Sequence, residues 1–195
     1  MSVLDHFGII APFYDMVFGR NSKIDWVAVL AVAPGLRILD VAGGTGRVVA
    51  DFPTRGCQAV VVDESFGMLQ QSKKKRGIQS VCARAEHLPF PASIFDRVIM
   101  VDAMHHLADQ VQSAAEMIRV LRSEGILVLQ EPDIRKLAIK FVALFEKILM
   151  MRTHFLNAEQ ITKLFDVPDR QIEINRQDWA ILISVRRKLR KANSQ

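Results

Sequence analysis

The sequence predicts an α/β fold built around a mostly parallel β-sheet. Apolar runs of strand length alternate with helical segments through residues 36–131, at the spacing that βαβ units show. A glycine-rich turn follows the first of these runs, and an acidic residue ends the second. With 195 residues, half of them apolar, the chain is long enough to form one domain with a sizeable core.

The strands and helices are expected in a regular order. Strands are predicted at about 36–41, 58–63, 79–83, 95–101 and 126–130, and helices at about 46–53, 66–76 and 109–122. Gly77 is expected to cap the second helix after a basic last turn, and Ser123–Gly125 to end the third. The first 30 residues are expected to be helical, with Tyr14, Phe18 and Trp26 providing aromatic surface.

The last quarter of the chain breaks this alternation. A helix is predicted at about 134–152 and a short one at 158–165, followed by strand-like runs at 171–175 and 179–185. The two runs are so close in sequence that they should form an antiparallel hairpin. We expect one domain over 1–195, with a helical cap (1–30), a core (36–131), lid-like helices (132–168) and a terminal hairpin (171–185).

The glycine-rich turn and the acid predict a nucleoside-bearing cofactor. Gly43, Gly44 and Gly46 let the backbone turn sharply and leave no Cβ in the path of a ligand. Asp63 lies at the end of the next strand, about 20 residues later, where a carboxylate can accept both hydroxyls of a ribose.

Other ligand classes fit this turn less well. A dinucleotide fingerprint starting at Gly44 would meet Val49 where its third small residue should stand, and Asp40 inside the strand is foreign to it. A phosphate-binding P-loop is excluded because no Gly-Lys-Ser/Thr follows the glycines. A plain strand-to-helix connection is the remaining alternative, and the spacing to Asp63 argues against it.

Five segments in order resemble class I S-adenosylmethionine-dependent methyltransferases. Leu39–Gly46 and Val60–Leu69 look like the first two motifs, Ala83–Phe90 like the adenine-side segment, Phe95–Leu107 like the fourth strand with its loop, and Arg119–Leu129 like the closing helix-turn-strand. Phe13–Asp15 also fits the family. The family more often has glycine where this chain has Ala42, and alanine before Gly-Gly-Thr-Gly resembles the branch that C-methylates ubiquinone and menaquinone precursors.

The resemblance implies a Rossmann-like sheet of seven strands, mostly parallel with one antiparallel strand, and helices on both faces. It also implies S-adenosyl-L-methionine as cofactor. The implied binding residues are Tyr14, Asp40, Ala42, Gly43, Gly44, Gly46, Asp63, Glu64, Met68, Ala85, Glu86 and Val101.

Several of these residues have more than one interpretation. The turn 42–46, at the start of the expected helix 46–53, would donate to the methionine carboxylate, and Asp40 could accept from its ammonium group or orient the loop. Met68 could cover the adenine face or simply pack its helix. Glu86 could lie at the adenine edge or be an ordinary surface acid.

His105 and His106 are the candidate catalytic residues, because they follow the fourth strand where the family places its sulfonium. Methyl transfer is an in-line displacement that depends mainly on alignment at ~3–3.5 Å. An imidazole there could deprotonate a phenol or enol, since it titrates near the working pH. A role in stabilising the loop is the alternative, and at most one of two adjacent rings should face the substrate.

The predicted helix 134–152 bears on the acceptor. Lys136, Lys140 and Lys147 fall within a strip of about 40°, and most of the remaining circumference is apolar. Such a helix predicts burial in the core or in a homodimer, an apolar pocket, or peripheral membrane contact. Its position after the last core strand favours a hydrophobic acceptor, with Phe141, Leu144, Phe145 and Ile148 as lining candidates.

Composition narrows the class of function. The net charge of +5 comes largely from five basic residues within 186–191, so the body is near neutral and no nucleic-acid partner is expected. Cys57 and Cys82 have neither metal nor redox spacing, which predicts no metal site and a reducing compartment. With no signal peptide or membrane-spanning run visible, a cytoplasmic location is expected.

The leading functional hypothesis is methyl transfer to a small, hydrophobic acceptor such as a phenol or quinone precursor. The alternatives are a nucleic-acid methyltransferase and a non-catalytic S-adenosylmethionine-binding protein. The segment after the fourth strand, Val101–Met104, lacks the Pro-Pro-aromatic pattern of enzymes that methylate the amino groups of bases. Turnover would separate an enzyme from a binding protein.

Overall fold

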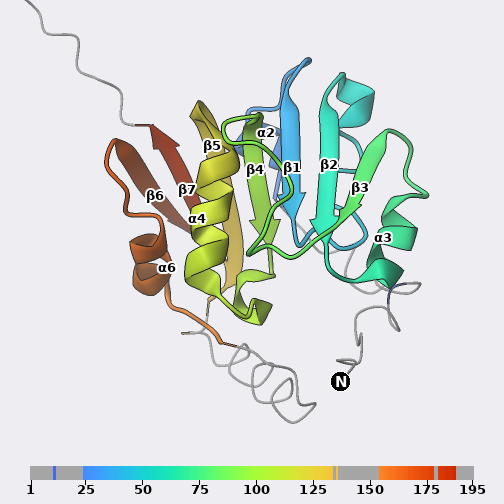
Figure 1. The fold of residues 1–195 in the computed structure, drawn as a ribbon. Helices are drawn as coiled ribbons and strands as arrows, with labels where there is room; N and C mark the ends of the chain where they lie inside the picture. Colours follow the sequence, from blue (N-terminus) through green and yellow to red (C-terminus); the bar gives the residue numbers. More distant parts are fainter. Residues whose placement is uncertain (1–10, 12–23, 134, 136–153, 178–179, 188–195) are drawn as a thin grey trace, which may run out of the picture.

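Seven strands of the described residues form one sheet, in the order β3-β2-β1-β4-β5-β7-β6 (Figure 1). The computed structural model describes residues 11, 24–133, 135, 154–177 and 180–187. The strands are β1 (Arg37–Val41), β2 (Gln58–Asp63), β3 (Ile78–Cys82), β4 (Phe95–Val101), β5 (Leu121–Pro132), β6 (Arg170–Arg176) and β7 (Ala180–Arg187). The helices are α2 (Trp26–Val29), α3 (Phe66–Ser72), α4 (Gln110–Val120) and α6 (Ala158–Leu164), with 3-10 turns η1 (Pro53–Arg55) and η2 (Met104–His106).

The first five strands are parallel, and β7 is the antiparallel one. In the centre of the sheet, Leu39 of β1 lies opposite Val60 of β2 and Val98 of β4. On the other side, Ile183 of β7 pairs antiparallel with both Leu129 of β5 and Ile174 of β6. The predicted fold class and the terminal hairpin are therefore confirmed.

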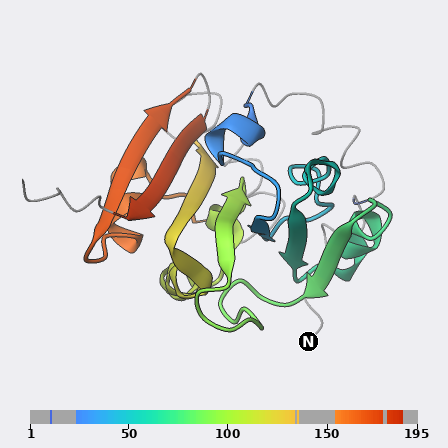
Figure 2. The same ribbon diagram turned by 90° about the horizontal axis from the view of Figure 1, so that it is seen from above.

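Helices cover both faces of the sheet (Figure 2). Successive side chains of a strand point to opposite faces, so Ile38 and Leu39 of β1 enter two different cores. Met117 of α4 and Ile161 of α6 belong to the core on the Leu39 side. Leu30, the C-terminal cap of α2, and Leu69 of α3 belong to the core on the Ile38 side, as expected for a doubly covered sheet.

Polar caps set where the helices begin. The Ser65 hydroxyl accepts from the backbone N–H of Met68, and the Asp109 carboxylate accepts from that of Gln112. These N-caps fix the first residues of α3 and α4. Asn157 and Gln160 form a reciprocal capping box at the start of α6.

Three expected elements are wrong or misplaced. Residues 44–52 form turns rather than the helix predicted at 46–53, because Gly44 and Gly46 adopt left-handed φ angles of 55° and 71° that an α-helix cannot continue. Helix α3 ends at Ser72, four residues before the predicted end. Strand β5 begins at Leu121, directly after α4, and crosses the expected turn at 123–125 with a register shift against β4.

The N-terminal aromatic surface is also revised. Trp26 is only 8% exposed and packs in the Ile38-side core, so it belongs to the interior. Tyr14 and Phe18 lie outside the described residues. Within the part of the chain that the structure describes, no helix is long and apolar enough to cross a membrane.

Candidate cofactor and acceptor site

The glycine-rich turn follows β1 and hydrogen-bonds to the carboxyl end of β2. The backbone N–H of Gly43 donates to the carbonyl of Val62 at 3.1 Å, and that of Gly44 donates to Asp63 Oδ2 at 2.8 Å. A second turn bond, from Gly46 N to Gly43 O at 2.8 Å, closes the loop. The backbone donors that the sequence assigned to a helix N-terminus are thus donors of a turn.

Asp63 ends β2 and bonds backbone amides on both sides of this edge. Besides the bond from Gly44, its Oδ1 accepts from the backbone N–H of Ser65 at 2.8 Å. A carboxylate has about four acceptor positions, so its bonds to two amides are compatible with further bonds from ribose hydroxyls. The side chain is held on both oxygens and only half-buried, which suits a ligand contact.

Asp40 is a buried carboxyl directly beneath the turn. It is 1% exposed, and neither carboxyl oxygen has a hydrogen-bond partner among the described residues. Burial raises the pKa of Asp40 to about 7, although Arg47 acts to lower it. A buried acceptor without a donor is costly in the folded protein, and an ammonium group bound at this turn would satisfy it.

Gly43 is required by its contact with Asp40. A Cβ at position 43 would lie 2.4 Å from Cγ of Asp40, a distance at which one of the two groups must move. Gly44 has a different constraint: its φ is 55°, and a Cβ there would come no closer than 3.7 Å to Met68 Sδ and 4.0 Å to Asp63 Oδ2. Gly43 therefore makes room for Asp40, whereas Gly44 provides backbone geometry.

We expect Gly43→Ala to destabilise the protein by about 1–3 kcal/mol through this overlap. Urea denaturation measures the change. In an Asp40→Ala background the same substitution should cost much less, because the crowded side chain is gone. Equal costs in the two backgrounds would show that Asp40 is not the group that excludes a side chain at position 43.

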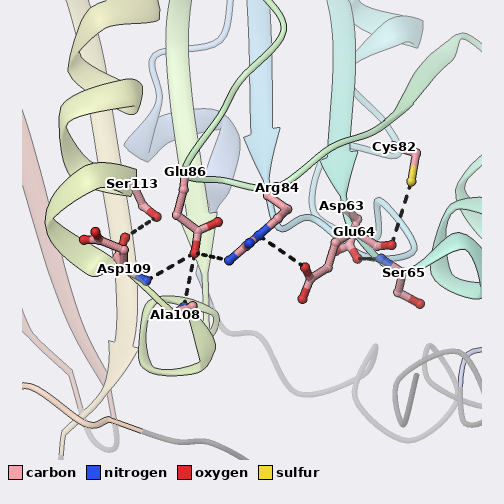
Figure 3. A network of polar contacts seen from close by, with 9 residues as sticks. All are labelled: Asp63, Glu64, Ser65, Cys82, Arg84, Glu86, Ala108, Asp109 and Ser113. Atoms are coloured by element: carbon pink, nitrogen blue, oxygen red, sulfur yellow. Dashed lines mark hydrogen bonds and ion pairs between the residues drawn. The ribbon is translucent and has the colours of Figure 1, made fainter. Parts of the chain in front are cut away.

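The adenine-side segment after β3 is tied to the loop before α4 (Figure 3). Glu86 is 5% exposed, and its Oε1 accepts from the backbone N–H groups of Ala108 and Asp109, each at 3.2 Å. Arg84 lies between Glu86, at 3.3 Å, and Glu64, at 3.8 Å. The interpretation of Glu86 as an ordinary surface acid is wrong, because its carboxylate anchors the start of α4.

Five other predicted cofactor residues fall at the same edge. Ala85 is buried, Val101 ends β4 partly buried, and Glu64 follows β2 with its side chain exposed. Met68 is 3% exposed in the first turn of α3, beside Gly44. Ala42 precedes the glycines with a left-handed φ of 52°, a conformation that favours glycine.

The loop after β4 contains polar residues that sequence reasoning missed. Asp102 has a φ of 52°, pairs with Arg47 of the glycine-rich turn at 3.7 Å and accepts from Gln130 Nε2 at 2.9 Å. Burial raises the pKa of Asp102 to about 6, while the bond from Gln130 lowers it. A sequence signal for these contacts was available. Gln130 and Glu131 lie at the end of a strand parallel to the one that Asp63 ends, so their polar side chains lie at the same edge of the sheet.

The two histidines of η2 have different environments. His105 is 4% exposed, and its Nδ1 lies 2.6 Å from Glu131 Oε2. Its ring stacks on Phe155 with centroids 4.3 Å apart and planes 13° apart. His106 is partly buried, and burial lowers its pKa to about 3, with a smaller contribution from the neighbouring His105.

Apart from Tyr14, which lies outside the described residues, every predicted site residue lies at the carboxyl edge of β1–β4 (Figure 1). Three observations fit S-adenosylmethionine: a buried orphan carboxylate, a left-handed glycine backbone facing an acid, and polar loops on neighbouring strands. No group of three or more potential metal ligands occurs among the described residues.

Comparisons with known proteins find methyltransferases of similar sequence and fold. Residues 39–129 match the family model described as a methyltransferase domain. The fold resembles a putative methyltransferase solved in complex with the Trm112 activator of Haloferax volcanii, with a TM-score of 0.80 at 16% identity, covering 96% of this chain and 100% of that one. Over residues 39–129 the chain is similar to the methyltransferase-domain family, and its fold is that of solved methyltransferases.

Within this family the similarity is to the quinone-methylating branch. The chain is 33% identical to the demethylmenaquinone methyltransferase of Renibacterium salmoninarum, over 64% of this chain and 56% of the relative. It is 34% identical to the ubiquinone/menaquinone biosynthesis C-methyltransferase UbiE of Shewanella frigidimarina, over 66% of this chain and 58% of the relative. The matched region thus spans less than three fifths of either relative's length.

Proposed function

We propose that this chain transfers a methyl group from S-adenosylmethionine to a small, hydrophobic, hydroxylated aromatic acceptor of the phenol or quinol type. The observation that carries the proposal is at the carboxyl ends of β1 and β2. There the Asp63 carboxylate accepts from the Gly44 amide, and the buried Asp40 carboxyl has no hydrogen-bond donor among the described residues. The similarity to demethylmenaquinone methyltransferases supports the class of acceptor.

The cofactor's parts fit different residues of this edge. Asp40 would accept hydrogen bonds from the ammonium group of the methionine end, while the amides of the turn's three glycines already bond within the protein. Asp63 would accept from the ribose hydroxyls, and Ala85 and Glu86 would hold the adenine side. When bound, S-adenosylmethionine supplies a methyl group on a positively charged sulfur, which is a strong electrophile.

The chain's own contribution to the reaction is alignment and a base. Two polar side chains of β5 hold the segment after β4 in one position, because Glu131 bonds the amides of Ala103 and Met104 and Gln130 bonds Asp102. A fixed loop presents the acceptor in line with the methyl group. His105, in contact with this loop's anchor, removes the proton of a phenolic or enolic acceptor.

Asp63→Ala is expected to weaken S-adenosylhomocysteine binding by about 1.5–3 kcal/mol, the free energy of hydrogen bonds to a charged acceptor. Isothermal titration calorimetry measures the change. Asp51→Ala is the matched control, because Asp51 is an exposed acid between β1 and β2 that is not among the site residues. An unchanged affinity in Asp63→Ala would remove Asp63 from the cofactor site.

A turnover screen tests the proposed function. Phenols, catechols, quinols, amines and a short RNA are incubated with the protein and S-adenosylmethionine, and formation of S-adenosylhomocysteine is measured. We expect turnover with hydrophobic phenols or quinols and none with RNA. Cofactor binding without turnover on any acceptor would favour a binding protein, and turnover confined to RNA would favour a nucleic-acid methyltransferase.

Several expectations stay predictions. The lid helix 134–152, with Phe141, Leu144, Phe145 and Ile148, lies almost wholly outside the described residues. The apolar pocket, the homodimer and the peripheral membrane contact expected from that helix depend on the same segment. We also propose the single-domain organisation and the cytoplasmic location as the sequence predicts them.

A further inference from the structure

A buried carboxylate on β5 lies against His105, the candidate catalytic base. Glu131 is 3% exposed, and its Oε2 is 2.6 Å from Nδ1 of His105. We propose that Glu131 is a positioning residue: it holds His105 in the Nδ1–H form, so that Nε2 removes the proton of the methyl acceptor. This inference rests on the function proposed above and assigns a residue that the sequence motifs did not indicate.

The second oxygen of Glu131 is held by two backbone amides. Oε1 accepts from the backbone N–H groups of Ala103 at 3.0 Å and Met104 at 2.8 Å. Bonds from amide donors favour the ionised form of a carboxyl group. An ionised carboxylate can only accept, so the donor in the short contact is the Nδ1–H of His105. In the neutral ring, Nε2 is then the basic atom.

The ring is also held from its faces and through its backbone. Phe155 stacks on it at 4.3 Å, and the His106 ring lies beside it with centroids 4.1 Å apart. The carbonyl of His105 accepts from the His154 amide at 2.7 Å. The ring of a base must be oriented as well as neutral, and these contacts, together with Glu131, restrict both rotation and tautomer.

In the described part of the chain, titratable groups near His105 lie on β5, after β4 and in η2. Glu131 lies on β5, Asp102 follows β4, and His106 shares η2. The two acids stabilise the imidazolium that forms on proton transfer, as an acid does for the base in hydrolytic triads. Because its pKa is lowered to about 3, His106 is neutral near pH 7 and adds no repulsive charge.

The step balances without another reactant. The acceptor's O–H bond breaks, its proton goes to Nε2, and its electron pair remains on the phenolate. The phenolate forms a bond from oxygen or ring carbon to the methyl group, and the carbon–sulfur bond breaks with its electrons on sulfur, leaving neutral S-adenosylhomocysteine. For ring-carbon attack, the displaced ring proton leaves to water as aromaticity returns.

Glu131→Gln tests the assignment with almost no change in size. The amide oxygen can still accept from Ala103 and Met104, which turns the NH₂ group toward His105. Nδ1 must then be an acceptor, and the proton moves to Nε2, where it blocks the base. We expect kcat to fall by about 10²–10⁴-fold with cofactor affinity and melting temperature nearly kept.

The pH profile separates positioning from a purely structural role. The loss in Glu131→Gln should shrink as the pH rises toward ionisation of the phenol, because a phenolate needs no base. Glu131→Asp, which keeps the charge, should recover part of kcat. Asp96→Asn is the matched control: this carboxyl also accepts a backbone amide, from Arg37 at 2.8 Å, but it lies near the start of β4, at the opposite end of the strand.

A readout that does not need turnover is the ring tautomer. Two-dimensional ¹⁵N NMR of histidine-labelled protein at pH 8, assigned with His105→Asn, should show Nδ1–H in the wild type and Nε2–H in Glu131→Gln. A wild-type Nε2–H ring would overturn the proposal, as would full kcat in Glu131→Gln or a loss that does not depend on pH. Absence of turnover on every acceptor would instead overturn the proposed function, and the role of Glu131 with it.

Discussion

Replacing His105 with asparagine is expected to lower kcat by about 10²–10⁴-fold while cofactor affinity is kept. The amide NH₂ of asparagine can take over the bond from Nδ1 to Glu131, so the loop keeps its anchor and loses only the ring nitrogen that acts as base. Single-turnover kinetics with a phenolic acceptor, alongside calorimetry with S-adenosylhomocysteine, measure the two effects separately.

His106→Asn is the internal comparison. His106 is adjacent in sequence, but its ring is only partly buried. The hydrogen bond of Glu131 is with His105. We expect its replacement to change kcat by less than about tenfold, since it is not the base. A large loss in His106→Asn with normal kcat in His105→Asn would reverse the assignment, and normal kcat in both would exclude an essential histidine base.

Asp40→Asn should stabilise the cofactor-free protein at neutral and basic pH while it weakens cofactor binding. The pKa of Asp40 is about 7 in the folded protein because of burial, against ~3.9 in the unfolded chain. A raised pKa means that the group's contribution to stability is full below about pH 4 and is lost as the pH rises through 7. The asparagine variant has no such loss.

The difference in unfolding free energy between Asp40→Asn and wild type should therefore grow from pH 4 to pH 7 and stay level above. Its pH-dependent part is at most about 4 kcal/mol, from the three-unit difference in pKa. Urea denaturation between pH 5 and 8 gives the curve. A pH-independent difference would mean that Asp40 is ionised in the free protein, with a partner that compensates its charge.

The opposite effect on binding follows from the same burial. Without the carboxylate, an ammonium group at the turn loses a charged acceptor, which costs about 1.5–3 kcal/mol. Calorimetry with S-adenosylhomocysteine measures this loss. Together, higher stability and lower affinity identify Asp40 as a residue retained for ligand binding at the expense of stability, whereas losses of both would indicate a role in holding the loop.

The strands could be predicted because their signal is local. The apolar run at 58–63 coincides with β2, and the closely spaced runs near the end of the chain form the β6–β7 hairpin. The helix at 46–53 was wrong because helical propensity is overridden by two glycines with left-handed φ. Which strands would be neighbours came from the family resemblance, since pairing between distant segments leaves no local pattern.

The site could be predicted where a motif carries it and not where tertiary pairing does. Asp40, Gly44 and Asp63 stand at fixed spacing around one turn, so the sequence indicates them together. Glu131 and Gln130 hydrogen-bond to a loop more than 25 residues away in sequence. Their bonds to Ala103, His105 and Asp102 form only when the chain folds. An acid at the end of β5 was a visible sign, but its partner was not.

The placement of β7 between β5 and β6 has a consequence for synthesis on the ribosome. Strand β6 leaves the ribosome before the strand that joins it to the sheet, so it cannot dock until β7 has followed. Until then the nascent chain exposes the edge of β5, the strand whose end carries Glu131, as a template for unwanted pairing. Chaperones that cover strand edges during translation should therefore matter most in the interval between emergence of Arg170 and Arg187.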